Sequence, residues 1–435
     1  MAPATASLLL IGLMFLGLAS GLWIGLGLGL VGYLAFMLMT NANPALSFGT
    51  TIWGSMNSWT LTALPMFIFM GEILFRSRLS DDMFRGLAPW MQRLPGRLLH
   101  TNVFGCGIFA AISGSSAATA ATIGRMTIPE LRRRGYDDFM NIGSLAGSGT
   151  LGLLIPPSLI MIVYGVAAEV SIARLFIAGV IPGIVLMLIF SGVLMGWALA
   201  NPQMVPPRDP PMSVAAKLWE SRRLIPIVGL ILLVLGSIYT GWATPTESAV
   251  LGVVGALALT LATGTFSWRM FSDSVMGAVR TNAMIGLILA GASFLTTAMG
   301  FTGLPRLFAE WINAQGFSQF ALIMALMVVY IILGCLIDGI SMVVLTAAVV
   351  LPAVKAAGID LVWFGIFVVL VVEMAQITPP VGFNLFVLQA MTGKPLGYIA
   401  LAALPFFLAM IAMVFIMIAV PELATWLPNQ MLGQK

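Results

Sequence analysis

Long apolar runs separated by short polar turns fill the chain from end to end. Many of these runs reach about 17–25 residues, which is enough for a helix to cross roughly 30 Å of hydrocarbon. The runs are rich in Leu, Met, Ala and Gly and lack the strict apolar–polar alternation of membrane β-strands. The pattern therefore predicts an all-α polytopic membrane protein.

The chain contains an internal repeat with an offset of 223 residues. Pro156 and Pro157 return as Pro379 and Pro380, and the same offset relates four further turn or helix-breaking residues: Pro129 to Pro352, Gly135 to Gly358, Asp137 to Asp360 and Pro182 to Pro405. Matches of Pro, Gly and Asp at breaks and turns are much harder to obtain by chance than matches of Leu or Ala within apolar helices. We conclude that one unit is written twice.

The repeat predicts two five-span units, 1–207 and 224–435, joined by a cytoplasmic linker at 208–223. Each unit is expected to hold scaffold helices, an arm, a re-entrant helical hairpin, a helix broken at Pro-Pro and a final span. These five parts are predicted at 7–76, 77–98, 99–134, 139–168 and 172–199 in the first unit, and at 224–299, 300–317, 318–356, 361–391 and 396–420 in the second.

Charge decides the topology of the first hairpin. Arginines cluster on both sides of it, between Arg76 and Arg97 and again at 132–134. Both clusters can lie in the cytoplasm, as the positive-inside rule favours, only if the intervening stretch enters the membrane and returns with its tip at 113–116. Five crossings then separate the two hairpins, so the second hairpin enters from the opposite face and the repeat is inverted.

Composition supports this class and limits the chemistry. Of the 435 residues, 60% are hydrophobic and 8% are charged, too few charges for the surface of a soluble domain. One histidine, His100, and two cysteines, Cys106 and Cys335, offer no metal cluster or disulfide framework. An intramembrane enzyme with serine nucleophiles at 113–116 is the remote alternative, because no general base accompanies them.

Polar residues interrupt both hairpins at equivalent positions. The first tip holds Ser113, Gly114, Ser115 and Ser116, the second Asp338, Gly339 and Ser341, and Ser115 corresponds to Asp338. An acid at membrane depth costs at least about 2.5–3.5 kcal/mol, so Asp338 needs a proton, an arginine or a cation. We favour a cation, although Asp338 can also be protonated or cap a helix, and the serines can serve close packing.

The Pro-Pro breaks supply the remaining candidate ligands. Free carbonyls near a break can complete each cation site, around Gly149, Thr150 and Gly152 in one half and around Gln376 and Thr378 in the other. Such hard oxygen ligands suit Na⁺ rather than transition metals. We place the substrate beside the same breaks, with these residues: Ser116, Pro156, Pro157, Pro379, Pro380 and Asn384.

Some of these residues can instead serve a purely structural role. The prolines can serve packing, and Asn384 can make a plain interhelical hydrogen bond. Four glutamates, Glu72, Glu169, Glu247 and Glu373, lie near inferred segment ends, where capping or snorkelling is expected. Arg125 and Arg280 are further candidate partners for a substrate carboxylate.

Three stretches together resemble one known family. Residues 105–135, which contain Ala-Ile-Ser-Gly-Ser-Ser-Ala-Ala-Thr-Ala-Ala, the break at 149–158 and the stretch 373–384 resemble the large membrane subunit of tripartite ATP-independent periplasmic (TRAP) transporters of the C4-dicarboxylate type. The resemblance implies an elevator-type secondary transporter in the bacterial inner membrane, driven by Na⁺ rather than ATP. It implies no cofactor beyond this coupling ion and no nucleic-acid partner.

The resemblance also implies partners and ligand sets. The partners would be a small four-helix membrane subunit and a periplasmic binding protein that delivers organic acids such as dicarboxylates, keto acids or sialic acid. One Na⁺ site would involve Ser113, Ser115 and the carbonyls of 149–152, and the other Asp338, Ser341, Gln376 and Thr378. A stand-alone carboxylate symporter coupled to Na⁺ or H⁺ remains the alternative.

Overall fold

The computed structural model describes residues 12–13, 16, 22–40, 43–302, 310, 318–335, 337–380 and 382–433. Within these ranges the chain forms helices joined by turns, with no β-strand. Most of the first apolar run at 8–20 and most of the arm at 300–317 lie outside the described residues.

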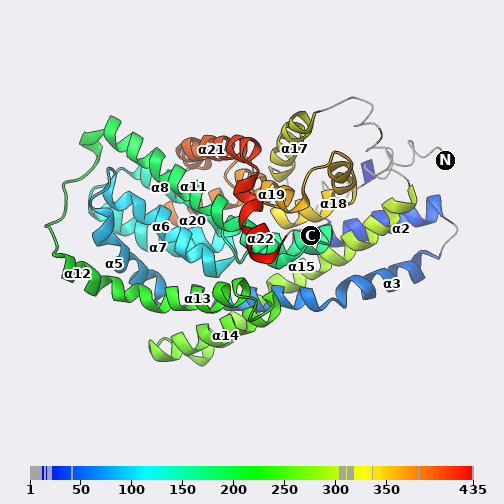
Figure 1. The fold of residues 1–435 in the computed structure, drawn as a ribbon, viewed down its shortest axis with the longest axis horizontal. Helices are drawn as coiled ribbons and strands as arrows, with labels where there is room; N and C mark the ends of the chain where they lie inside the picture. Colours follow the sequence, from blue (N-terminus) through cyan, green and yellow to red (C-terminus); the bar gives the residue numbers. More distant parts are fainter. Residues whose placement is uncertain are drawn as a thin grey trace.

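The helices of the first half form the blue-to-green part of Figure 1. They are α2 (Ile24–Met39), α3 (Pro44–Met56), α4 (Ala63–Phe75), α5 (Leu79–Met91), α6 (His100–Ser113), α7 (Ser116–Arg133), α8 (Asp138–Gly149), α9 (Leu151–Leu154), α10 (Leu159–Ala168) and α11 (Ile172–Ala200). The apolar run at 61–75 forms a 3-10 turn followed by α4, and α3 precedes it at an angle of 61°.

The second half follows from green to red. Its helices are α12 (Val214–Ser221), α13 (Ile225–Tyr239), α14 (Pro245–Ala262), α15 (Trp268–Thr302), α17 (Gln319–Gly334), α18 (Gly339–Ala356), α19 (Leu361–Gln376), α20 (Phe383–Thr392), α21 (Leu396–Ala419) and α22 (Glu422–Leu432). Helix α15 is continuous over 35 residues, because its polar positions include no proline that would interrupt it.

Local signals set the helix boundaries that frame the hairpins. Asp137 begins α8 by accepting a hydrogen bond from the Met140 N–H at 2.8 Å, and Asp360 begins α19 by accepting one from the Trp363 N–H at 2.8 Å. These two N-caps are the Asp pair of the 223-residue repeat. Equivalent aspartates therefore cap the N-terminus of the broken helix in each half, with the same hydrogen bond.

Membrane-spanning capacity is clear from helix length and hydropathy. Among the described residues, six helices are long and apolar enough to cross a membrane, or eight if each of two bent pairs counts as one span. One bent pair is α8–α9 with α10, which changes direction by 41° at the Pro156-Pro157 break. The protein is a multi-pass, all-helical membrane protein.

Helix α19 lies near the middle of the molecule (Figure 1). It packs against α9, α10, α11, α17, α18 and α21, and every residue from Val362 to Ala375 is buried. It ends at Gln376, just before Pro379-Pro380, and α20 begins beyond this break. A helix buried on all sides is where segments from both halves of the chain can meet.

Candidate functional site

The first hairpin tip is built from its own hydroxyl groups. Gly114 adopts a left-handed conformation (φ 61°) that ends α6, and Ser115 then caps α7 by accepting a hydrogen bond from the Ala118 N–H at 3.4 Å. The hydroxyls of Ser113 and Thr119 lie 2.6 Å apart. The chain therefore reverses at the predicted position, and its small polar residues gather at the turn.

The first tip contacts the first helix break closely. A Cβ added to Gly152 would lie 2.6 Å from the carbonyl oxygen of Ser115, and one added to Gly114 would lie 2.9 Å from the carbonyl oxygen of Pro157. The Leu159 N–H also donates a hydrogen bond to the Gly114 carbonyl at 3.4 Å. The structure thus brings the predicted tip residues and break residues together.

Gly149 and Thr150, which were also predicted for this site, make contacts of other kinds. Gly149 packs against α7, where an added Cβ would lie 2.8 Å from the Cβ of Ala120. The Thr150 hydroxyl donates a hydrogen bond to the Gly147 carbonyl at 2.6 Å. The proton of the Thr150 hydroxyl is therefore engaged by its own helix, while the lone pairs of the hydroxyl oxygen are not used by this bond.

At the second tip, Asp338 is a helix N-cap. Its Oδ2 accepts hydrogen bonds from the N–H groups of Ile340 and Ser341, each at 3.1 Å, and the Ser341 hydroxyl donates to its Oδ1. The capping alternative is thus observed. Capping does not exclude coordination, because a carboxylate has further lone pairs on both oxygens.

The second tip also contacts the second break. A Cβ on Gly339 would collide with Val372 and would lie 3.6 Å from Nε2 of Gln376. The carbonyl oxygens of Gln376 and Thr378 converge on Gly382, at 2.8 and 2.9 Å from the position of its missing Cβ. The Thr378 carbonyl accepts the Gly382 N–H at 3.0 Å, and the Thr378 hydroxyl donates to the Met374 carbonyl at 2.6 Å.

Glu373 is the functional candidate that sequence reasoning misplaced. The expectation of snorkelling or capping is wrong for it: Glu373 is completely buried in α19. Its Oε1 accepts hydrogen bonds from the Ser116 hydroxyl and, at 3.0 Å, from the Leu153 N–H, while its Oε2 has no hydrogen-bond partner among the described residues. The sequence did offer one signal, because Glu373 is the only charged residue in the apolar stretch that forms α19. Its partners lie far away along the chain, so no local sequence pattern indicated them.

The remaining three glutamates lie near helix ends. Glu247 forms a capping box with Thr244, Glu169 ends α10 in a left-handed conformation, and Glu72 pairs with Arg76 one turn away. These positions agree with the expectation for residues near helix ends. Glu373 differs from these three because its side chain is completely buried and its carboxyl group is hydrogen-bonded to Ser116 and Leu153, more than 200 residues away.

Adjacent residues of α19 contact the two tips. Val372 lies against Gly339 of the second tip, and Glu373 is hydrogen-bonded to Ser116 of the first. Both tips and the first break therefore meet at one turn of α19.

Asn384 lies in the first turn of α20, just after the second break. Its side chain is completely buried, and neither its amide oxygen nor its amide nitrogen has a hydrogen-bond partner within the described part of the chain. The interhelical hydrogen bond considered as an alternative is not found there. A buried amide with both groups free is a suitable element for binding a polar ligand.

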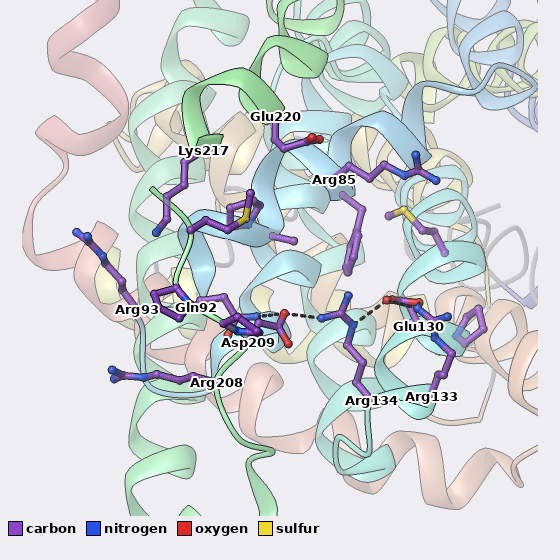
Figure 2. Close-up of a pocket in the computed structure, with 18 of the residues that line it drawn as sticks. Arg85, Gln92, Arg93, Glu130, Arg133, Arg134, Arg208, Asp209, Lys217 and Glu220 are labelled. Carbon is purple, nitrogen blue, oxygen red and sulfur yellow. Dashed lines mark hydrogen bonds and ion pairs between the residues drawn. The ribbon is translucent and has the colours of Figure 1, made fainter. Parts of the chain in front are cut away.

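A separate basic cavity of about 980 Å³ lies between α5, α7 and the segment 208–217 (Figure 2). Seven basic side chains, one of them Arg125, and three acidic side chains line the cavity. None of the predicted tip or break residues lines it. Figure 2 shows Arg134 between Glu130 and Asp209, with nitrogen–oxygen distances of 2.7 and 2.5 Å. Burial raises the pKa of Glu130, but hydrogen bonds and charges from Arg134 and Arg133 outweigh it, and the net shift is downward.

The fold and these sites define a class before any family is considered. Helices broken at paired prolines, with polar hairpin tips that contact a central helix, are features of secondary transporters. A solved structure supports the fold: the YdaH transporter of Alcanivorax borkumensis matches with a TM-score of 0.65 over the whole of both chains, at 14% sequence identity.

The sequence then assigns the family. Residues 11–423 match the family described as the tripartite ATP-independent periplasmic transporter, DctM component. The chain is 32% identical, over 92% of its length and 93% of the relative's, to the C4-dicarboxylate TRAP transporter large permease protein DctM of Pseudomonas aeruginosa. It is 26% identical, over 97% of both chains, to the sialic acid TRAP transporter large permease protein SiaM of Vibrio cholerae. The chain belongs to the DctM family of TRAP transporter large permease subunits, and its role is transport rather than catalysis.

Proposed function

We propose that this chain is the permease subunit of a Na⁺-coupled importer of organic acids. The observation that carries the proposal is the meeting of both hairpin tips at Val372 and Glu373 of α19. The buried Glu373 carboxyl group there has no hydrogen-bond partner for its Oε2 among the described residues, which is typical of a ligand site rather than of a packed core.

Oxygen chemistry supports Na⁺ as the coupling ion. The tips and breaks offer carboxylate, hydroxyl and carbonyl oxygens at Asp338, Ser341 and Gln376 in one half, and at Ser113, Ser115 and Gly152 in the other. Among the described residues no group of three or more His, Cys, Asp or Glu could hold a metal ion. A monovalent hard cation suits such mixed, weakly charged oxygen sets.

Two features support an organic anion as cargo. Helices α7 and α18 begin at the two tips, and α10 and α20 begin after the two breaks, so four helix N-termini with their positive dipole ends lie in the tip and break regions. The basic cavity of Figure 2 would add a positive field on the face that the arginine clusters place in the cytoplasm. Two of the relatives are named for C4-dicarboxylates and sialic acid, which are carboxylates and fit this electrostatic pattern.

The proposal extends to the assembly. We infer two inverted halves in the bacterial inner membrane, an elevator movement of hairpins and broken helices past the scaffold, and two partners: a small membrane subunit and a periplasmic binding protein. The basic linker side chains on one face of the molecule support the orientation.

Reconstitution tests the function. This chain, the small membrane subunit and the binding protein would be assembled in liposomes. Uptake of radiolabelled succinate and of radiolabelled sialic acid would then be measured under imposed ion gradients. We expect uptake of at least one acid only with all three proteins and an inward Na⁺ gradient. Uptake driven by a pH gradient without Na⁺ would reject Na⁺ coupling, and uptake by this chain alone would favour the stand-alone symporter.

A further inference from the structure

The two hairpin tips differ in charge at equivalent positions. Asp338 is the N-cap of α18 at the second tip, whereas Ser115 is the N-cap of α7 at the first. No residue from 113 to 116 carries a charge. A cation at the first tip would therefore meet only neutral oxygens from its own hairpin, although a charge buried at membrane depth requires a counter-charge.

The second half supplies a carboxylate to the first tip. Glu373 extends from α19, its Oε1 accepts the Ser116 hydroxyl, and the same oxygen accepts the Leu153 N–H, one residue beyond Gly152. Gly152 in turn lies against the Ser115 carbonyl. The Glu373 carboxyl therefore lies beside the residues proposed for the first cation site.

The geometry leaves one oxygen of Glu373 available. Both hydrogen bonds go to Oε1, while Oε2 is buried and has no donor within the described residues. A purely structural tie between α19 and the tip would not require a carboxyl group whose second oxygen has no hydrogen-bond partner. A bound cation would satisfy Oε2 and neutralise the carboxylate at once.

We propose that Glu373 is the carboxylate ligand of the first cation site, donated by the opposite half of the chain. Each tip then has one carboxylate, Asp338 from its own hairpin and Glu373 from across the repeat, and each can neutralise one Na⁺. This inference rests on the proposed Na⁺ coupling. It would also couple ion binding in the two halves, because the first site is incomplete without a residue of the second half.

Ion counting on the purified subunit tests the proposal. Equilibrium binding of ²²Na⁺ would be measured for wild type, Glu373→Gln, Asp338→Asn and the double variant. Glutamine retains an oxygen that accepts the Ser116 and Leu153 hydrogen bonds, so the substitution removes mainly the charge. We expect two ions on wild type, one on each single variant and none on the double variant, with Glu247→Gln, a capping-box control, still binding two.

A relocation variant separates a ligand from a structural tie. Ser115→Asp combined with Glu373→Gln moves the carboxylate to the position that corresponds to Asp338. We expect this double variant to regain the second ion. If it binds only one ion while remaining folded, a carboxylate at the tip does not restore the first site, which would contradict the proposal that Glu373 supplies the charge of that site.

The outcomes distinguish the two levels of the argument. Wild type that binds no Na⁺ would overturn the proposed function, whereas wild type and Glu373→Gln that both bind two ions would overturn only this inference. If Glu373→Gln does not fold, its ion count is replaced by a second measurement, the Na⁺-induced infrared difference spectrum of Asp338→Asn. A carboxylate band that shifts with Na⁺ in this variant supports Glu373 as the ligand, and an unshifted band rejects it.

Discussion

The hydroxyl of Ser116 donates a hydrogen bond to Oε1 of Glu373, although 257 positions separate the two residues along the chain. The Leu153 N–H reaches the same oxygen, and the neighbouring Val372 lies against Gly339 of the other hairpin. One turn of α19 thus holds both tips and the first helix break.

Asp338 has two roles that different substitutions separate. Asp338→Ala removes both the carboxylate and the N-cap of α18, so we expect a loss of about 0.5–2 kcal/mol of stability together with loss of Na⁺ stimulation. Asp338→Asn keeps a capping oxygen, so we expect near wild-type thermal stability without Na⁺ stimulation of uptake. Thermal unfolding in detergent and uptake in liposomes measure the two effects. Full Na⁺ stimulation of a folded Asp338→Asn variant would reject the ligand assignment.

Gly152 allows the first break to approach the first tip. Gly152→Ala would place a methyl group 2.6 Å from the Ser115 carbonyl, so one backbone must move. We expect a loss of about 1–3 kcal/mol from overpacking and a larger proportional loss of transport. Gly192→Ala in α11 is the matched control, because nothing lies within 4 Å of its Cβ position. Equal behaviour of the two variants would show that the close approach has no importance.

Asn384 distinguishes a binding role from a structural role. Because its buried amide has no partner among the described residues, Asn384→Leu should leave the unfolding temperature unchanged or raise it. We expect the same variant to lose most of its substrate uptake. A lowered unfolding temperature with normal uptake would indicate that the amide is a structural hydrogen-bonding group instead.

The linker contact at the basic cavity should contribute little to stability. Asp209 accepts hydrogen bonds from Arg134 and Gln92, but about half of its side chain is exposed. We therefore expect Asp209→Asn to lower the free energy of unfolding by no more than about 1 kcal/mol. Thermal unfolding at low and high salt measures this difference, and a loss of several kcal/mol would show that the linker is a structural clamp.

Features that repeat along the chain could be predicted from the sequence. The Pro156-Pro157 and Pro379-Pro380 breaks and the Asp137 and Asp360 caps follow from local backbone chemistry that both copies of the unit share. The Gly114 turn belongs to the first copy alone, because the equivalent position in the second copy is Ile337. These signals located both tips and both breaks. The local hydrogen bonds of Thr150 and Thr378 were not foreseen, because the sequence does not show which way a hydroxyl points.

Features set by tertiary packing could not be predicted. Glu373 was misplaced because its partners, Ser116 and Leu153, lie more than 200 residues away, so no periodicity records their contact. Helix α15 exceeds its apolar part because none of its polar positions is a proline that would interrupt it. The free amide of Asn384 is likewise visible only once its neighbours are in place.

The central claim is that two inverted halves bring their hairpin tips together from opposite faces of the membrane. Arg133 and Ala356 occupy equivalent exposed positions at the ends of α7 and α18. Arg133→Cys and Ala356→Cys would be introduced separately into a background lacking Cys106 and Cys335, and labelled with a membrane-impermeant maleimide in intact and in inverted membrane vesicles. We predict that Arg133→Cys reacts from the cytoplasmic side only and Ala356→Cys from the opposite side only. Labelling of both from the same side would contradict the account.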